Sequence, residues 1–176
     1  AAAASRDRVQ QVLDTKEMLE DAGTAVRTVS AGGTYSYDVV GDVDGVTEVI
    51  AGSYALMDGR YRLHRAEFAP AARVLSTVGS VPEDGVAITD GGQKAIGADT
   101  GEPSLDGPPG GSIKSLSAEH GNLTFDPAAH ESLHLGDKVW AIPWDIGSCV
   151  NLHDYMHCAR DGRLEAVWEI PARGRY

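Results

Sequence analysis

Positive charge is scarce in this sequence, and long apolar runs are absent. Lys and Arg number 15 against 26 Asp and Glu, which gives a formal net charge of -11. A surface of that sign repels nucleic-acid phosphates and anionic lipid, so we expect neither nucleic acid nor a membrane as a partner. No apolar stretch approaches the roughly 20 residues that are needed to span a bilayer.

Cysteine is scarce as well. Cys149 and Cys158 are the only two, and two cysteines do not make a disulfide framework. The first residues, AAAASRDRVQ, lack the basic and apolar regions of a signal peptide. Both absences favour a reducing, cytoplasmic location. With 176 residues, 42% of them hydrophobic, the chain is large enough for one domain, or for one domain plus a fragment of another.

The first third of the chain follows an α/β pattern. Apolar residues recur at helical spacing over residues 6–22, which predicts a helix that stops at Gly23. Two β-rich runs follow, TAVRTVS at residues 24–30 and VTEVIAGSYALMD at residues 46–58, and each breaks at a glycine turn. This order is typical of an α/β barrel or an open sheet, but only about two units are present where a closed barrel needs eight.

After about residue 66 the pattern changes to short β-rich runs separated by Gly, Pro and Asp. The runs are ARVLSTVGSV, GVAITDGG, SLSAEHGNLTF, KVWAIPW and LEAVWEIPA, with a Pro/Gly-rich loop at residues 100–112. Their spacing and the lack of helical periodicity predict an antiparallel β-domain. We therefore expect an α+β protein with an incomplete α/β barrel in residues 1–65 and a β-domain in residues 66–176.

Two glycine turns after the α/β strands are the best local signal for a ligand. Ser30, Gly32, Gly33 and Thr34 offer close backbone N–H groups and two hydroxyls, a combination that suits a phosphate. On its own, Gly-Gly after a strand is more often a simple tight turn. A second turn, AGSY at residues 51–54, brings Ser53 and Tyr54 to the end of the next strand, where a barrel collects its ligands.

Seven segments in order resemble the D-threonine aldolases and D-serine dehydratases. The segments are VSAGGTYSY, AGSYALMD, TDGGQKAIGADTGEP, SAEHGNL, LGDKVWAIP, VNLHD and WEIPARGR. Each is short, and the resemblance as a whole spans about residues 6–175. These families belong to the alanine-racemase-like, fold-type III pyridoxal-phosphate enzymes. The resemblance implies the terminal α/β units of a TIM-type barrel, a C-terminal β-domain, and a dimer with its sites near the interface.

The resemblance also implies a cofactor, pyridoxal 5'-phosphate. Its phosphate would be lined by the residues of the two turns, Ser30, Gly32, Gly33, Thr34, Ser53 and Tyr54. In the family, the lysine that carries the cofactor lies on the first barrel strand, upstream of everything in this sequence. None of Lys16, Lys94, Lys114 and Lys138 has that context. We therefore expect a partner, namely a complementary N-terminal barrel half that carries the lysine.

The segment PWDIGSCVNLHD, residues 143–154, corresponds to the family's metal site. There the resemblance implies a His-x-Cys or His-x-Asp pair that binds a divalent metal beside the cofactor. Counting back from VNLHD puts Asp145 at the histidine and Gly147, which has no side chain, at the second ligand. We therefore expect no tightly bound metal, because Asp145 alone is a weak hard-cation ligand.

Two residues remain candidates for catalysis. Asp145 is a candidate general base, with a turn-capping role as the alternative. His120, in SAEHGNL, matches a family segment and is the second catalytic candidate, although a lone histidine in such a place is more often structural. Cys149 and His153 would reach the metal position only if the loop were rebuilt.

Two functions of different classes follow. The first is the C-terminal part of a pyridoxal-phosphate enzyme that acts on D-amino acids or β-hydroxy amino acids, as an aldolase, dehydratase or racemase. The broken metal pair weakens the two reactions that need a held β-hydroxyl, and favours racemisation or aldol cleavage with another base. The second is a non-catalytic subunit that supports a partner chain, as the missing lysine suggests.

Overall fold

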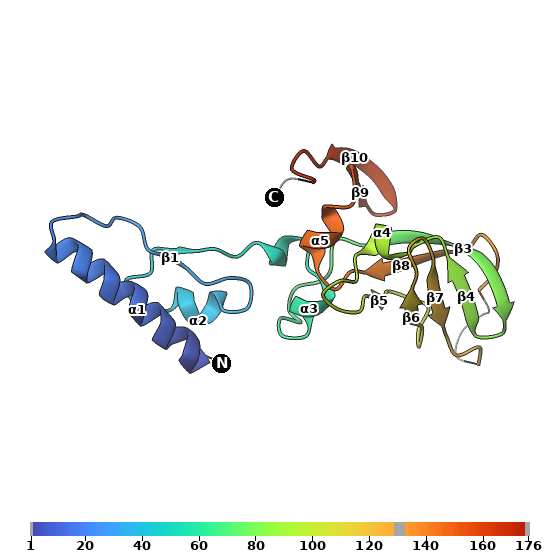
Figure 1. Cartoon of the computed structure of the whole chain (residues 1–176), viewed down its shortest axis with the longest axis horizontal. Coiled ribbons are helices and arrows are strands. Elements are labelled where there is room, and N and C mark those ends of the chain that lie inside the picture. Colours follow the sequence, from blue (N-terminus) through green and yellow to red (C-terminus); the bar gives the residue numbers. More distant parts are fainter. Residues whose placement is uncertain (1, 129–132, 175–176) are drawn as a thin grey trace. The chain divides into compact units, whose positions relative to one another are not determined.

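The computed structural model describes residues 2–128 and 133–174. The chain divides into two compact units (Figure 1). The first consists of Ala1–Ala55 and Tyr61–Phe68, and the second of Leu56–Arg60 and Ala69–Tyr176. Within the described ranges, no helix combines the length and the apolar character that crossing a membrane requires.

The first unit carries the α/β part of the chain. Its elements are α1 (Ala2–Asp21), β1 (Ser30–Ala31), α2 (Tyr37–Gly41), β2 (Glu48–Val49) and the 3-10 turn η1 (Ser53–Ala55). The helix predicted at residues 6–22 is confirmed, although it begins earlier, at Ala2. Gly23 follows it with φ of +85°, the left-handed conformation that commonly terminates helices. Helix α2 lies beside α1 (Figure 1).

The two strands of this unit are much shorter than the sequence predicts. Strand β1 includes only Ser30 of the run at residues 24–30, and β2 includes only Glu48 and Val49 of the run at residues 46–58. A strand exists only where its backbone finds a neighbour, and local residue preference does not report that. The pairing that does form, between β1 and β2, is parallel, as α/β units require.

The second unit is built on a six-stranded antiparallel sheet, which confirms the predicted antiparallel β-domain. The order is β5-β8-β3-β4-β7-β6, and the end strands β5 and β6 approach each other, so the sheet is nearly closed into a barrel. The strands are β3 (Val74–Glu83), β4 (Val86–Thr89), β5 (Ser104–Leu105), β6 (Ser112–Leu116), β7 (Gly121–Thr124) and β8 (Lys138–Ile142).

The core of this unit lies inside the sheet. Side chains alternate along each strand, so every second residue of β4 and β7 is buried. The buried apolar cluster consists of Val78, Ala87, Leu123, Phe125, Leu133 and Val139. Removal of these side chains from water is the main stabilising term for a sheet of short strands.

The remaining elements were not all predicted. Helix α3 (Gly59–Arg62), helix α4 (Gln93–Ile96) and helix α5 (Ile146–Val150) are short. Strands β9 (Tyr155–Arg160) and β10 (Arg163–Glu169) form a separate two-stranded hairpin (Figure 1), of which the sequence predicted only β10. The loop expected at residues 100–112 contains β5, which pairs with β8.

Candidate cofactor and metal sites

The two predicted phosphate turns meet at one edge of the β1–β2 pair. Because these strands are parallel, with Ser30 opposite Glu48 and Ala31 opposite Val49, their carboxyl ends point the same way. The Ile50 N–H continues the ladder to the Ala31 carbonyl at 3.2 Å. Both turns therefore start side by side, as ligand-binding loops of α/β units do.

A hydrogen bond joins the two turns. The Oγ1 of Thr34 accepts from the backbone N–H of Tyr54 at 3.2 Å, and the Thr34 side chain is buried. Acceptance leaves the hydroxyl proton of Thr34 available for a further acceptor. Tyr54 follows Ser53 in η1, is 47% exposed, and tilts against the ring of Phe68 at 5.6 Å between centroids.

The glycines of the first turn have different roles. Gly32 has φ of +81°, and an added Cβ would lie 3.2 Å from Val40, so this position needs glycine for both backbone and space. At Gly33 an added Cβ would meet only the Ile50 carbonyl, at 3.8 Å. The hydroxyl of Ser30 donates to the Glu48 carboxylate, so its proton is already committed.

The sequence did not point to Arg65, which holds this turn in place. Its Nε donates to the Tyr35 carbonyl at 2.9 Å, and its Nη1 donates to Asp38 at 2.9 Å. The hydrogen bond from Arg65 is the largest cause of the lowered pKa of the Asp38 carboxyl. The stacked rings of Tyr35 and Tyr61, 4.2 Å apart, add to the same cluster. An arginine this distant in sequence from the turn carries no local signal.

Asp145, in the second unit, caps helix α5. Its Oδ1 accepts from the Ser148 backbone N–H at 3.0 Å, and its Oδ2 pairs with the Arg60 guanidinium at 3.2 Å. The capping role that the sequence left as an alternative is therefore present. The side chain is only 22% exposed, so the ion pair is partly shielded from water.

The two neighbouring side chains that could bind a metal, Cys149 and His153, do not form a metal-binding cluster with Asp145. Both Cys149 and His153 contact the carbonyl oxygen of Ala95, the thiol from 3.6 Å and the imidazole Nε2 from 2.7 Å. Burial, and secondarily the charge of Asp145, raises the pKa of the Cys149 thiol to about 11. Across residues 2–128 and 133–174, no three His, Cys, Asp or Glu side chains are placed to share a metal ion.

His120 lies in the exposed turn between β6 and β7. Its backbone N–H donates to the Ser117 hydroxyl at 3.2 Å, and its carbonyl accepts from the Ser117 N–H at 2.8 Å. An added Cβ on Gly92 would lie 2.5 Å from this turn's backbone. The motifs TDGGQKAIG and SAEHGNL are thus packed together, which gives both a structural role whatever His120 does chemically.

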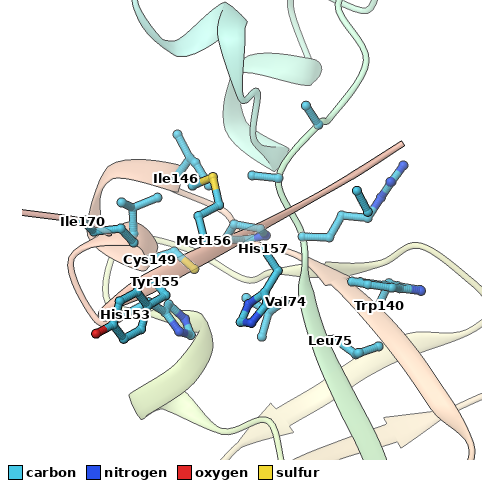
Figure 2. A pocket seen from close by; sticks show the side chains of 16 residues that line it. Val74, Leu75, Trp140, Ile146, Cys149, His153, Tyr155, Met156, His157 and Ile170 are labelled. Atoms are coloured by element: carbon cyan, nitrogen blue, oxygen red, sulfur yellow. The ribbon is translucent and has the colours of Figure 1, made fainter. Parts of the chain in front are cut away.

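A groove of about 520 Å³ lies between strands β3 and β8, helix α5 and the β9–β10 hairpin. Its lining is mainly apolar, and Figure 2 shows Cys149, His153, His157 and Met156 around it. Neither Asp145 nor His120 lines this groove. The groove therefore borders the segment of the family's metal site without being lined by Asp145 itself.

Three of the lysines have surface partners. Lys16 pairs with Glu20 within α1 at 2.6 Å, and Lys94 pairs with Glu119 at 2.5 Å. Lys138 donates to the Thr77 hydroxyl at 2.6 Å.

Comparisons with known proteins support the resemblance found in the sequence. D-threonine aldolase from Arthrobacter sp is 36% identical over 162 residues, which are 90% of this chain and 42% of that protein. 3-Hydroxy-D-aspartate aldolase from Paracoccus denitrificans is 31% identical over 176 residues, 95% of this chain and 45% of that protein. The chain thus spans less than half the length of these curated relatives.

Solved structures give the same picture. D-threonine aldolase from Filomicrobium marinum superposes with a TM-score of 0.88 at 29% identity, over 98% of this chain and 48% of that one. D-threo-3-hydroxyaspartate dehydratase from Delftia sp. HT23 gives 0.79 at 27% identity, over 95% and 50%. The model of the putative serine dehydratase domain matches residues 71–159, just over half of the chain. The chain therefore belongs to the family of the putative serine dehydratase domain.

Proposed function

We propose that this chain is the C-terminal part of a pyridoxal-phosphate-dependent enzyme that acts on small β-hydroxy D-amino acids. The observation that carries the proposal is the joining of the two turns by the bond from the Tyr54 N–H to Thr34. That bond sets two hydroxyl-bearing segments side by side at the carboxyl edge of a parallel strand pair. The names of the relatives, D-threonine aldolase and 3-hydroxy-D-aspartate aldolase, supply the substrate class.

The residues of the two turns fit a phosphate. The hydroxyl of Thr34 still has its proton to donate, and Gly32 and Gly33 allow backbone to approach closely. Ser53 and Tyr54 would add their hydroxyls from the second turn. Ser30 would contribute through its backbone, because its hydroxyl donates to Glu48. When bound, pyridoxal phosphate withdraws electrons from the substrate Cα.

The architecture of the whole enzyme is part of the proposal. Residues 1–65 would complete a TIM-type barrel whose earlier units lie in an N-terminal half, and residues 66–176 would form the β-domain. The N-terminal half would carry the lysine, and the complete enzyme would be a cytoplasmic dimer. The parallel β1–β2 pair in the first unit supports the barrel assignment, since barrel strands are parallel.

The complete protein tests the proposal directly. Reconstituted with pyridoxal phosphate, it should bind one cofactor per chain and turn over D-threonine or D-3-hydroxyaspartate, with the L-enantiomers as controls. Cleavage of Cα–Cβ yields glycine and an aldehyde, whereas loss of the β-hydroxyl yields ammonia and a 2-keto acid, so product analysis separates aldolase from dehydratase. Conversion of D-alanine to L-alanine would identify a racemase. A complete protein that binds no cofactor would favour the non-catalytic subunit.

A further inference from the structure

Arg60 is fixed beside the position of the family's metal site. Three hydrogen bonds join the segment around Arg60 to the segment around the start of α5. The Gly59 N–H donates to the Pro143 carbonyl at 2.9 Å, and the Arg60 N–H donates to the Trp144 carbonyl at 3.2 Å. The Ile146 N–H donates to the Asp58 carboxylate at 3.1 Å. Asp58 is 1% exposed and the preceding Met57 is fully buried with φ of +59°. A buried non-glycine residue in that conformation persists only where its surroundings fix it.

Both oxygens of the Asp145 carboxylate are already used. Oδ1 accepts from the Ser148 backbone N–H at 3.0 Å and lies 3.4 Å from the Ser148 hydroxyl. Oδ2 faces the Arg60 guanidinium at 3.2 Å. A divalent ion at this carboxylate would have to displace one of these donors and would also sit close to a fixed positive charge.

The second ligand position faces the same carboxylate. A Cβ added to Gly147 would lie 3.3 Å from Asp145 Oδ1, so a side chain there would start beside the capping oxygen. Glycine leaves this space without a donor atom. The nearby thiol of Cys149 and the Nε2 of His153 both contact the Ala95 carbonyl instead. The residues present therefore do not fit a divalent metal.

We infer that the Arg60 guanidinium takes the place of the metal ion at this position, as a built-in cation that neutralises Asp145 and excludes divalent metal. An arginine side chain is permanently charged. The backbone hydrogen bond of Arg60 to Trp144 holds this residue beside Asp145. The chain thereby keeps one positive charge next to α5 while losing both the Lewis acid and its ligand pair. The inference concerns metal binding alone, so it stands or fails separately from the proposed reaction.

Metal binding by the complete protein tests this inference. The protein is treated with chelator, dialysed, equilibrated with Mn²⁺ or Zn²⁺, and assayed for bound metal by elemental analysis and by calorimetric titration. The parent should retain no stoichiometric metal. The double variant Asp145→His/Gly147→Cys rebuilds a ligand pair but keeps Arg60, so it should bind Zn²⁺ weakly. Adding Arg60→Ala should tighten Zn²⁺ binding at least about tenfold, because one nearby positive charge is removed.

Arg62→Ala is the matched control, since it removes an exposed arginine of the same short helix. Added to the double variant, it should leave Zn²⁺ affinity within about twofold, as expected for a solvent-screened charge. One Mn²⁺ or Zn²⁺ per parent chain after dialysis would overturn the inference even if every variant fails to fold. Equal Zn²⁺ affinity with and without Arg60 would overturn the role of the guanidinium.

Discussion

Thr34 is the residue through which the proposed cofactor site is most sharply tested. Thr34→Val keeps the shape of the side chain and removes the hydroxyl, whereas Thr34→Ser keeps the hydroxyl and removes a methyl group. In the folded chain the hydroxyl accepts from the Tyr54 N–H at 3.2 Å and is almost completely buried. The two variants therefore separate hydrogen bonding from packing.

The expected magnitudes differ for stability and for cofactor binding. Valine leaves the Tyr54 amide without this acceptor, which costs about 1–3 kcal/mol of folding free energy, with the 3.2 Å distance favouring the lower end. Serine loses a methyl, which costs about 1 kcal/mol. If the hydroxyl also donates to a phosphate, valine loses a further bond to a charged group, about 1.5–3 kcal/mol. That loss corresponds to roughly 10-fold to 150-fold weaker pyridoxal-phosphate binding.

The assay is a titration of the cofactor-free complete protein with pyridoxal phosphate, followed by absorbance, beside thermal unfolding of the same cofactor-free samples. Thr34→Val should lose both stability and affinity, while Thr34→Ser should stay within about threefold of the parent affinity, because it retains the donor. A Val variant that binds the cofactor as tightly as the parent would refute the phosphate assignment. Tyr54→Phe, which removes only the second hydroxyl, should weaken binding within the same range.

Two further predictions concern the second unit. Gly92→Ala should destabilise the chain by about 1–3 kcal/mol or more, because its Cβ would lie 2.5 Å from the backbone of the turn at residues 117–120. Gly79→Ala is the control, since a Cβ there would contact only a carbonyl oxygen at 3.9 Å. Equal denaturation midpoints for the two variants would contradict the packing argument. The Cys149 thiol, with its pKa raised to about 11, should react with iodoacetamide far more slowly at pH 8 than a free thiol does, in a variant that carries Cys158→Ser. The thiol pKa is 9.0 in the unfolded state and about 11 in the folded state, so the folded state holds this proton more tightly. The contribution of Cys149 to stability is therefore present below pH 9 and is lost as the pH rises towards 11. Rapid alkylation at pH 8 would contradict both statements.

The sequence predicted best the elements whose own residues favour the helix or strand that they form. The apolar spacing over residues 6–22 predicted helix α1, which ends at Asp21 shortly before Gly23. Strands β3, β4 and β8 are rich in Val, Ile and Trp and are bounded by turn residues. Strand β9, YMHCAR, was missed because Tyr155 is its only strong β-former, and pairing with β10 in the hairpin defines this strand instead. The two-residue strand β5 takes its pairing from β8.

The candidate site was predictable only in part, for a physical reason. Motifs of contiguous residues placed Thr34, Tyr54 and Asp145, and the structure then supplied partners that no contiguous motif contains. Arg65 lies beyond the second strand in sequence, and its guanidinium donates a hydrogen bond to the Tyr35 carbonyl next to the first turn. The carboxylate of Glu48, on the neighbouring strand, accepts a hydrogen bond from the Ser30 hydroxyl. Contacts of this kind depend on tertiary packing, which local residue preference does not encode.

The Arg60–Asp145 pair shows how substitutions at one site are coupled. An imidazole is neutral when it binds a metal, whereas a carboxylate at the same place brings a negative charge that is only 22% exposed. Burial of such a charge is costly unless a cation or several donors accompany it. Without a side chain at Gly147 a metal would be poorly held, so a cation supplied by the chain itself, together with the donors of Ser148, can stabilise the charge of Asp145. Arg60 meets that need from a turn whose backbone is bonded to the segment before α5. Aspartate, glycine and arginine at these three positions are therefore expected to change together among relatives, and a relative that restores both ligands should lack a cation at the position of Arg60.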